Sequence, residues 1–131
     1  MSRPTSGIAT DGAHSTKNRL TRYRAVDIAT ERELFREHIG NQTINIGEFL
    51  GVVDAIKYII AHNYSPPIIY TDSITAIAWF KAKRTASKKS NRVLAKAEVF
   101  LKAYATVIDK IEVRHWDNRE WGETPADFGE K

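Results

Sequence analysis

Four acidic residues far apart in the sequence have the types and the setting for chemistry. Asp11, Glu48, Asp72 and Asp127 each stand where an expected strand or helix begins or ends. Each alone also has a structural interpretation. Asp11 with Gly12 forms a common turn pair, and the other three occupy positions typical of helix N-caps or capping boxes. Taken singly, every one of these acids is more readily structural than catalytic.

The joint placement of the four acids favours chemistry. In a mixed α/β sheet, the carboxyl ends of strands and the starts of helices gather at one edge. Carboxylates that meet there repel one another unless cations intervene. The chain has no Cys, which excludes disulfide scaffolds, zinc ribbons and thiol nucleophiles. Oxygen ligands without clustered His suit Mg²⁺ or Mn²⁺, so we expect a divalent-metal site.

The elements that must position these acids follow from hydrophobic periodicity. Five strands are expected, at residues 8–11, 19–28, 33–39, 68–71 and 111–116. Helices are expected to run over residues 45–62, 74–83 and 93–108, with a last short one starting at 124. Asn45, Asp72 and Thr124 are the expected helix caps, and residues 12–18 an expected loop. The order βββ-α-β-α-α-β-α predicts an α/β fold with a mixed sheet covered by helices.

Length and composition limit the class of protein. The 131 residues suit one domain, 1–131, with residues 1–5 frayed. A content of 42% hydrophobic and 27% charged residues excludes collagen-like and wholly disordered chains. There is no apolar run of about 18 residues, so no membrane span is expected. The N-terminus lacks the apolar core of a secretory signal, so we expect a cytoplasmic protein.

The charge distribution points to a polyanionic partner. The net charge is +4, and residues 81–102 carry eight Lys or Arg against Glu98 alone, whereas acids prevail after residue 111. A cationic patch and an acidic C-terminal segment suggest a polyanion on one surface and cations at another. A merely solvated face is the alternative for the basic run.

Four segments resemble the signature segments of the type 1 ribonuclease H family. They read ATDG at 9–12, TINIGEFL at 43–50, IYTDS at 69–73 and WGETPAD at 121–127. Their order, spacing and expected elements match over residues 8–128, and the last one is similar to bacterial members in particular. The resemblance implies a ribonuclease H-like fold with a five-stranded mixed sheet.

The resemblance also implies an activity. Such enzymes are endoribonucleases that hydrolyse the RNA strand of RNA–DNA hybrids with two Mg²⁺ ions (Mn²⁺ being an alternative), leaving 5′-phosphate and 3′-hydroxyl ends. Asp11 would lie between the two ions. Glu48 and Asp72 would complete the more structured metal site, and Asp127 would hold the ion that activates water. The expected enzyme is a monomer without an obligate protein partner.

Substrate contacts are carried over from the same resemblance. Asn45 matches a residue that reads the minor groove, and Thr43 matches one that grips a DNA-strand phosphate, with helix capping as the alternative for both. Sugar discrimination requires such groove contacts, because phosphate contacts carry no sugar identity. The full set of expected nucleic-acid contacts is Gly12, Thr43, Asn45, Lys81, Lys83, Arg84, Lys88 and Lys89.

Departures from the family pattern put some contacts in doubt. Ile44 stands where many members carry a second groove-reading Asn, and Ile74 where some carry Gln, so hybrid contacts are expected to be fewer or differently placed. Residues 117–123 lack the His that the family carries before its last Asp. His115 is the nearest candidate, although strand alternation is expected to point it toward the core. Glu123 is the other candidate for an auxiliary role.

The connector at 84–90 is short and no hybrid-binding module precedes Ile8, so binding is expected to be modest and salt-sensitive.

Two alternatives stay open beside the hybrid ribonuclease. A non-catalytic hybrid- or RNA-binding module would have no need for four acids facing phosphate. A DNA-junction nuclease on the same fold is disfavoured by Asn45 and by the segment pattern.

Overall fold

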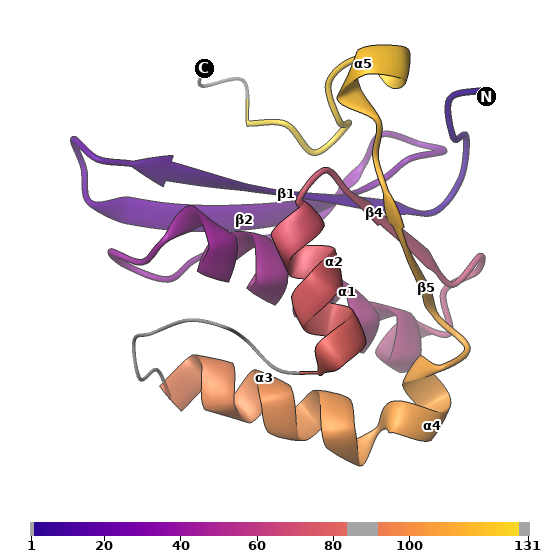
Figure 1. The fold of residues 1–131 in the computed structure, drawn as a ribbon. Helices are drawn as coiled ribbons and strands as arrows, with labels where there is room; N and C mark the ends of the chain where they lie inside the picture. The colour runs from indigo at the N-terminus through magenta and orange to yellow at the C-terminus, as the bar shows by residue number, and fades with distance from the viewer. Residues whose placement is uncertain (1, 84–91, 129–131) are drawn as a thin grey trace.

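A five-stranded mixed sheet forms the centre of the molecule (Figure 1). The computed structural model describes residues 2–83 and 92–128. The strands are β1 (Ile8–Ser15), β2 (Leu20–Asp27), β3 (Glu33–His38), β4 (Ile68–Thr71) and β5 (Glu112–His115). Their order across the sheet is β3-β2-β1-β4-β5, with β1, β2 and β3 antiparallel and β1, β4 and β5 parallel. The expected α/β class with a mixed sheet is confirmed.

Helices cover one face of this sheet, and the C-terminal segment crosses the other (Figure 1). The helices are α1 (Ile44–His62), α2 (Ile74–Ala82), α3 (Arg92–Ala103), α4 (Ala105–Ile108) and α5 (Asn118–Trp121). The first four lie on the helical face, and α5 lies on the opposite side. None of the helices in the described ranges is both long and apolar enough to cross a membrane.

Helix α1 packs the main core against β1 and β2. Its apolar residues recur every three or four positions, so Ile46, Phe49, Val53 and Ile56 are all buried on one stripe. Burial of each such side chain contributes about 1.5–3 kcal/mol. The helix approaches the sheet closely at Gly47, where a Cβ atom would lie 2.9 Å from Cγ2 of Thr21 on β2. A glycine is therefore required for this helix–strand distance.

A smaller apolar cluster holds the C-terminal segment on the open face of the sheet. Ala9, Val26 and Tyr70 from the strands pack with Trp116 and Ala126, the last two of which are fully buried. Strand alternation explains the division, because neighbouring residues of β1 point to opposite faces. The last described segment is thereby anchored to the sheet without belonging to a strand.

Strand β1 is twice as long as expected. The Asp11-Gly12 pair is not a turn, since β1 continues to Ser15 and Gly12 pairs with Tyr23 of β2. The loop expected at residues 12–18 is therefore wrong over residues 12–15. The turn interpretation used only local sequence, whereas the strand is maintained by pairing with a distant segment.

Two expected helix caps are wrong by one or two residues. Thr43 caps α1, its Oγ1 accepting from the N–H of Ile46 at 3.4 Å. Ser73 caps α2, its Oγ accepting from the N–H of Ala76 at 3.0 Å. Asn45 is thus a first-turn residue of α1, and Asp72 precedes the cap of α2. Neither side chain has the capping role that the sequence suggested.

The helices after residue 92 also differ from expectation. The single helix expected over residues 93–108 is divided at Tyr104 into α3 and α4. The helix expected from Thr124 is absent from the described residues, where the N–H of Asp127 closes a turn onto the carbonyl of Thr124 at 2.9 Å. Instead α5 forms earlier, with Asp117 accepting from two N–H groups of its first turn. The connector at 84–90 lies outside the described residues.

Candidate active site

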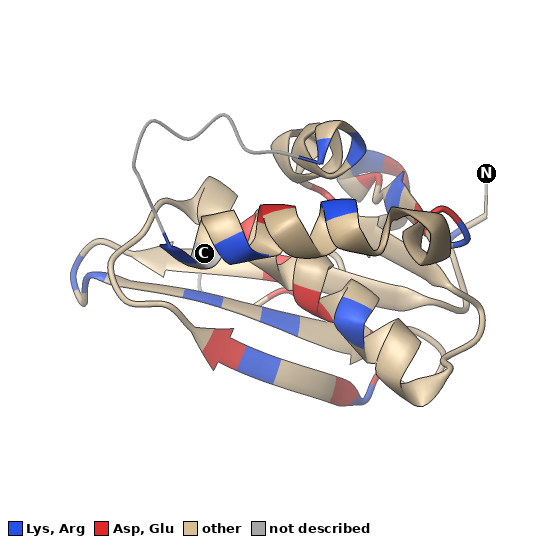
Figure 2. Cartoon of the chain, turned by 90° about the horizontal axis from the view of Figure 1, so that it is seen from below, with Lys and Arg blue, Asp and Glu red and all other residues tan. Residues whose placement is uncertain are grey.

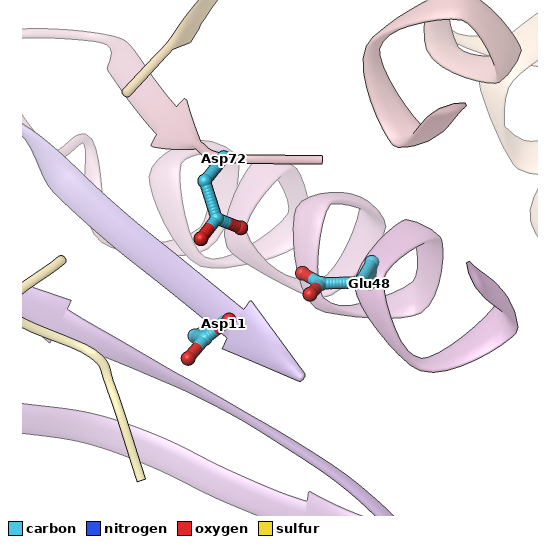
Figure 3. A group of neighbouring side chains, drawn as sticks. All are labelled: Asp11, Glu48 and Asp72. Atoms are coloured by element: carbon cyan, nitrogen blue, oxygen red, sulfur yellow. The ribbon is translucent and has the colours of Figure 1, made fainter. Parts of the chain in front are cut away.

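Three of the four acids meet at one edge of the sheet. Asp11 comes from the middle of β1, Glu48 from the second turn of α1, and Asp72 from the residue after β4. One carboxylate oxygen from each lies within 4.8 Å of the others, and Figure 3 shows the three groups facing a common space. Asp11 and Glu48 are buried, whereas Asp72 is half-buried.

The strand register sets two of these carboxylates side by side. Ala9 of β1 pairs in parallel with Tyr70 of β4, and the same offset carried two residues further places Asp11 level with Asp72. On the other side, Asp11 pairs with Arg24 of β2 in the antiparallel ladder. The antiparallel ladder therefore fixes Asp11, whereas Asp72 lies one residue past the end of β4, beyond the last parallel pair of Ala9 and Tyr70.

Gly12 lets the third carboxylate approach the sheet. A Cβ atom at residue 12 would lie 3.2 Å from the backbone nitrogen of Glu48 and 3.3 Å from its Cδ. The backbone N–H of Gly12 also donates to the Glu48 carboxylate. Helix α1 therefore rests against β1 at the one position without a side chain, and Glu48 reaches Asp11 there.

Glu48 is in an electrostatic environment that disfavours its charge. Burial first, and then the neighbouring carboxylates of Asp11 and Asp72, raise the pKa of Glu48 from its ordinary 4.5 to about 9. Its Oε2 atom is buried without a hydrogen-bond partner among the described residues. A buried carboxylate oxygen without a donor, beside two further acids, fits a divalent cation bound by oxygen ligands.

Helix α5 contributes a residue to this site that the sequence did not suggest. Nδ2 of Asn118 donates to Oδ2 of Asp72 at 3.0 Å, so the side chain of Asp72 is oriented from outside the trio. Asn118 is the first residue of α5, directly after its cap Asp117. The Asp117-Asn118 pair is a helix-start signal, although the elements expected from the sequence include no helix there.

Asp127 lies beside the trio rather than in it. It lines one pocket together with Asp11, Gly12, Ala13, His14, Ile44 and Phe128. Among the described residues, the close metal-binding group includes only Asp11, Glu48 and Asp72. The structure therefore brings Asp127 to the same pocket as Asp11, on the C-terminal segment that crosses β2.

His14 is a second residue that the sequence analysis missed. Its Nδ1 lies 2.8 Å from Oγ1 of Thr21, whose hydroxyl donates to the carbonyl of Gln42 at 2.6 Å. Because that hydroxyl proton is already committed, Nδ1 must carry the ring proton, which leaves Nε2 as the acceptor of the neutral ring. Recognising that β1 extends to residue 15 would have placed His14 on the same face as Gly12.

Some of the residues expected to contact substrate lie in the part of the chain that the structure describes. Thr43, Ile44 and Asn45 lie exposed at the start of α1, and Ile44 also lines the pocket that contains Asp11. Ile74 begins α2 with 73% of its surface exposed. The remaining basic positions are divided between the described end of α2, with Lys81 and Lys83, and the undescribed residues Arg84, Lys88 and Lys89. Figure 2 shows Lys and Arg on the helical layer and on the sheet.

The two candidate auxiliary residues have different positions. His115 is exposed on β5, so the expectation that it points toward the core is wrong. The reason is that β5 is an edge strand on which Val113 alone is partly buried. Glu123 is exposed in the segment between α5 and Asp127. Its auxiliary role stays a prediction.

Comparisons with known proteins agree on the architecture. No protein-family model matches the chain. LC11-RNase H1 in complex with an RNA/DNA hybrid is similar over 86% of this chain and 86% of that one, with a TM-score of 0.57 and 14% identity. RNase H1 from the archaeon Halobacterium salinarum gives the same coverage and TM-score at 16% identity. The fold is the ribonuclease H fold.

The ribonuclease H fold also occurs within a larger protein among the similar structures. The protease–reverse transcriptase of prototype foamy virus is similar over 88% of this chain and 18% of its own, with a TM-score of 0.59 and 16% identity. At these identities the likeness concerns the arrangement of the chain. The fold expected from the four sequence segments is therefore confirmed.

Proposed function

We propose that the protein is a metal-dependent endoribonuclease that hydrolyses the RNA strand of RNA–DNA hybrids. The observation that supports this most strongly is the meeting of Asp11, Glu48 and Asp72, from three separate elements, at one edge of a ribonuclease H fold. The candidate residues extend from 11 to 127, which supports a single catalytic domain.

The chain's own residues would act by binding the metal ions and by orienting the substrate. Asp11 on β1, Asp72 directly after β4, and Glu48, which rests against Gly12, would be the metal ligands, with Asp127 in the adjoining pocket. Bound divalent ions would supply the positive charge that stabilises the attacking and leaving oxygens of phosphodiester hydrolysis. Glu48 must lose its proton to serve as a ligand, because its raised pKa keeps it protonated at neutral pH.

The exposed start of α1 would contact the substrate. Asn45 carries an amide that both donates and accepts hydrogen bonds, which suits recognition of a 2′-hydroxyl in the wide minor groove of a hybrid. Thr43 and the first N–H groups of the helix would lie against backbone phosphate. Cleavage at this edge would leave a 5′-phosphate and a 3′-hydroxyl.

A cleavage assay tests the proposal. Labelled RNA–DNA hybrid, duplex RNA and duplex DNA are incubated with the wild-type protein, with and without Mg²⁺. The same assay is run on Asp72→Asn and on Asp109→Asn, which changes an exposed acid at the end of α4 outside the trio. We expect hybrid-specific, Mg²⁺-dependent cleavage that Asp72→Asn reduces at least a hundredfold and Asp109→Asn leaves intact. Hybrid binding without cleavage, or equal cleavage of duplex DNA, would contradict it.

A further inference from the structure

Arg24 of β2 makes an unusual set of contacts to the C-terminal segment. Its Nε donates to the carbonyl of Ala126 at 2.7 Å, and its Nη2 donates to the carbonyls of Asp127 at 2.7 Å and Pro125 at 3.3 Å. The remaining nitrogen, Nη1, forms an ion pair with Glu33 at 3.3 Å. All three nitrogens of this mostly buried guanidinium are therefore engaged. The three bonds to the segment use main-chain oxygens, not the Asp127 carboxylate.

The position of Arg24 in the sheet connects these contacts to the candidate site. Arg24 pairs with Asp11 across β1 and β2, on the open face where Ala126 is buried. Asp127 and Asp11 line the same pocket. The guanidinium that binds the backbone at residues 125–127 thus belongs to the strand next to Asp11. The pairing of β1 with β2 therefore sets the distance between Asp11 and the residue that holds the segment.

Phe128 anchors the segment on the other side of Asp127. Three guanidinium carbons lie close to the centre of its ring, those of Arg22 at 5.0 Å, Arg36 at 5.2 Å and Arg24 at 5.5 Å. These distances are typical of cation–π contacts. Asp127 is therefore held between a buried alanine and a ring resting on arginines. Arg24 contacts both, through its bond to the carbonyl of Ala126 and its position over the Phe128 ring.

We propose that Arg24 is a positioning residue, which binds the backbone carbonyls around Asp127 and thereby sets the carboxylate of Asp127 beside Asp11. The segment itself has no helix or strand at residues 125–128 that could do this. A planar guanidinium offers several donors in a fixed geometry, whereas a Lys ammonium is a single point on a flexible stem. The inference rests on the proposed function only for its catalytic consequence.

A paramagnetic probe measures this positioning without any nucleic acid. Mn²⁺ is added in substoichiometric amounts to isotope-labelled wild-type protein, Arg24→Gln, Arg24→Lys and Arg36→Gln. Line broadening is then compared at the backbone amides of residues 11, 48 and 127. Arg36→Gln is the matched control, because Arg36 shares the ion pair to Glu33 and the Phe128 ring but makes no described bond to the segment's carbonyls.

We expect Arg24→Gln and Arg24→Lys to reduce the broadening at residue 127 several-fold while residues 11 and 48 respond as in the wild type. Arg36→Gln should broaden all three as the wild type does. Unchanged broadening at residue 127 in Arg24→Gln would overturn the proposal. So would an equal loss at all three residues, because it would show a general structural role.

The catalytic consequence is tested in a double-mutant cycle with hybrid cleavage. Arg24→Gln should lower kcat on the order of ten- to a hundredfold with little change in KM, as expected when a reacting group is misplaced. In an Asp127→Asn background the same change should have no further effect. An equal additional loss there would overturn the proposal. If the wild type leaves hybrid uncut while the Mn²⁺ result is as expected, the proposed function fails and the positioning role stands.

Discussion

At the residue scale, the site is a place where three acids are held together against their own repulsion. The raised pKa of Glu48 has a direct consequence for stability. A group whose pKa is higher in the folded than in the unfolded state binds an extra proton on folding between the two values. The contribution of this proton to the stability of the folded state is complete below the unfolded pKa of about 4.5. It is lost as the pH rises through the folded pKa of about 9.

We therefore predict that the metal-free protein becomes less stable between pH 5 and pH 9, by at most about 1.4 kcal/mol per pH unit from this one proton. Glu48→Gln should remove this part of the decline, because the amide does not titrate. Urea unfolding in the presence of a chelator at several pH values measures it. Parallel pH profiles for the two proteins would show that Glu48 is not the responsible group.

Gly12 gives a second prediction at this scale. Gly12→Ala places a methyl group 3.2–3.3 Å from Glu48, close enough to push α1 or the carboxylate away. We expect a loss of about 1–3 kcal/mol in the free energy of unfolding, typical of overpacking, and a fall in kcat of about a hundredfold. Ala13→Gly, one residue further along β1, serves as a control for the change in strand propensity. Normal kcat in Gly12→Ala would mean that Glu48 tolerates the displacement.

At the element scale, the distance between α1 and β2 is set by Gly47 and Thr21. Gly47→Ala would place its Cβ 2.9 Å from Cγ2 of Thr21, and the Thr21 hydroxyl is fixed by bonds to Gln42 and His14. We predict a destabilisation of about 1–3 kcal/mol in urea unfolding, although alanine favours helix. Thr21→Ser removes Cγ2 and keeps the hydroxyl, so the double variant should regain most of the loss. Additive effects would exclude this contact as the cause.

The five strands and the two apolar helices before residue 84 were predictable from the sequence, whereas the exact ends and the short helices after residue 103 were not. The apolar stripe of α1 is a strong periodic signal and β4 is a short apolar, β-rich run, and both elements formed where expected. The caps of α1 and α2 were missed because Ser, Thr, Asn and Asp are nearly equivalent at an N-cap, and several of them stand within two residues of each of these two helix starts. That ambiguity matters here. If Asp72 were the N-cap of α2, its carboxylate would have a structural role, but Ser73 is the cap and the carboxylate of Asp72 faces the other two acids.

At the scale of the whole molecule, the contacts that complete the site join distant parts of the chain. Arg24 meets residues 125–127 about a hundred positions further along, and Asn118 meets Asp72 across 46. Nothing local in the sequence marks either pair. The resemblance to known segments pointed to the four acids, but it contained no information on which side chains would orient them.

The charge of the molecule gives a prediction at the same scale. Lys81 and Lys83 stand at the end of α2, and Lys110 lies after α4. Each phosphate contact contributes about 0.9 to the slope of log affinity against log salt. We expect Lys81→Gln with Lys83→Gln to reduce that slope for hybrid binding by up to about 2, measured by fluorescence anisotropy. Lys110→Gln should leave it unchanged, and a slope unaltered by the double change would remove α2 from the interface.

The carboxylates of Asp11, Glu48 and Asp72 come from β1, from α1 and from the residue after β4, which are well separated in the sequence. Unfolding any one of these elements separates the ligands, so an ion that all three acids bind is bound only by the closed molecule. Such an ion depletes the opened forms that proteases attack, by a factor that grows with its free concentration. The free Mg²⁺ concentration would then govern how long this protein resists proteolysis, and digestion in rising Mg²⁺ would show it.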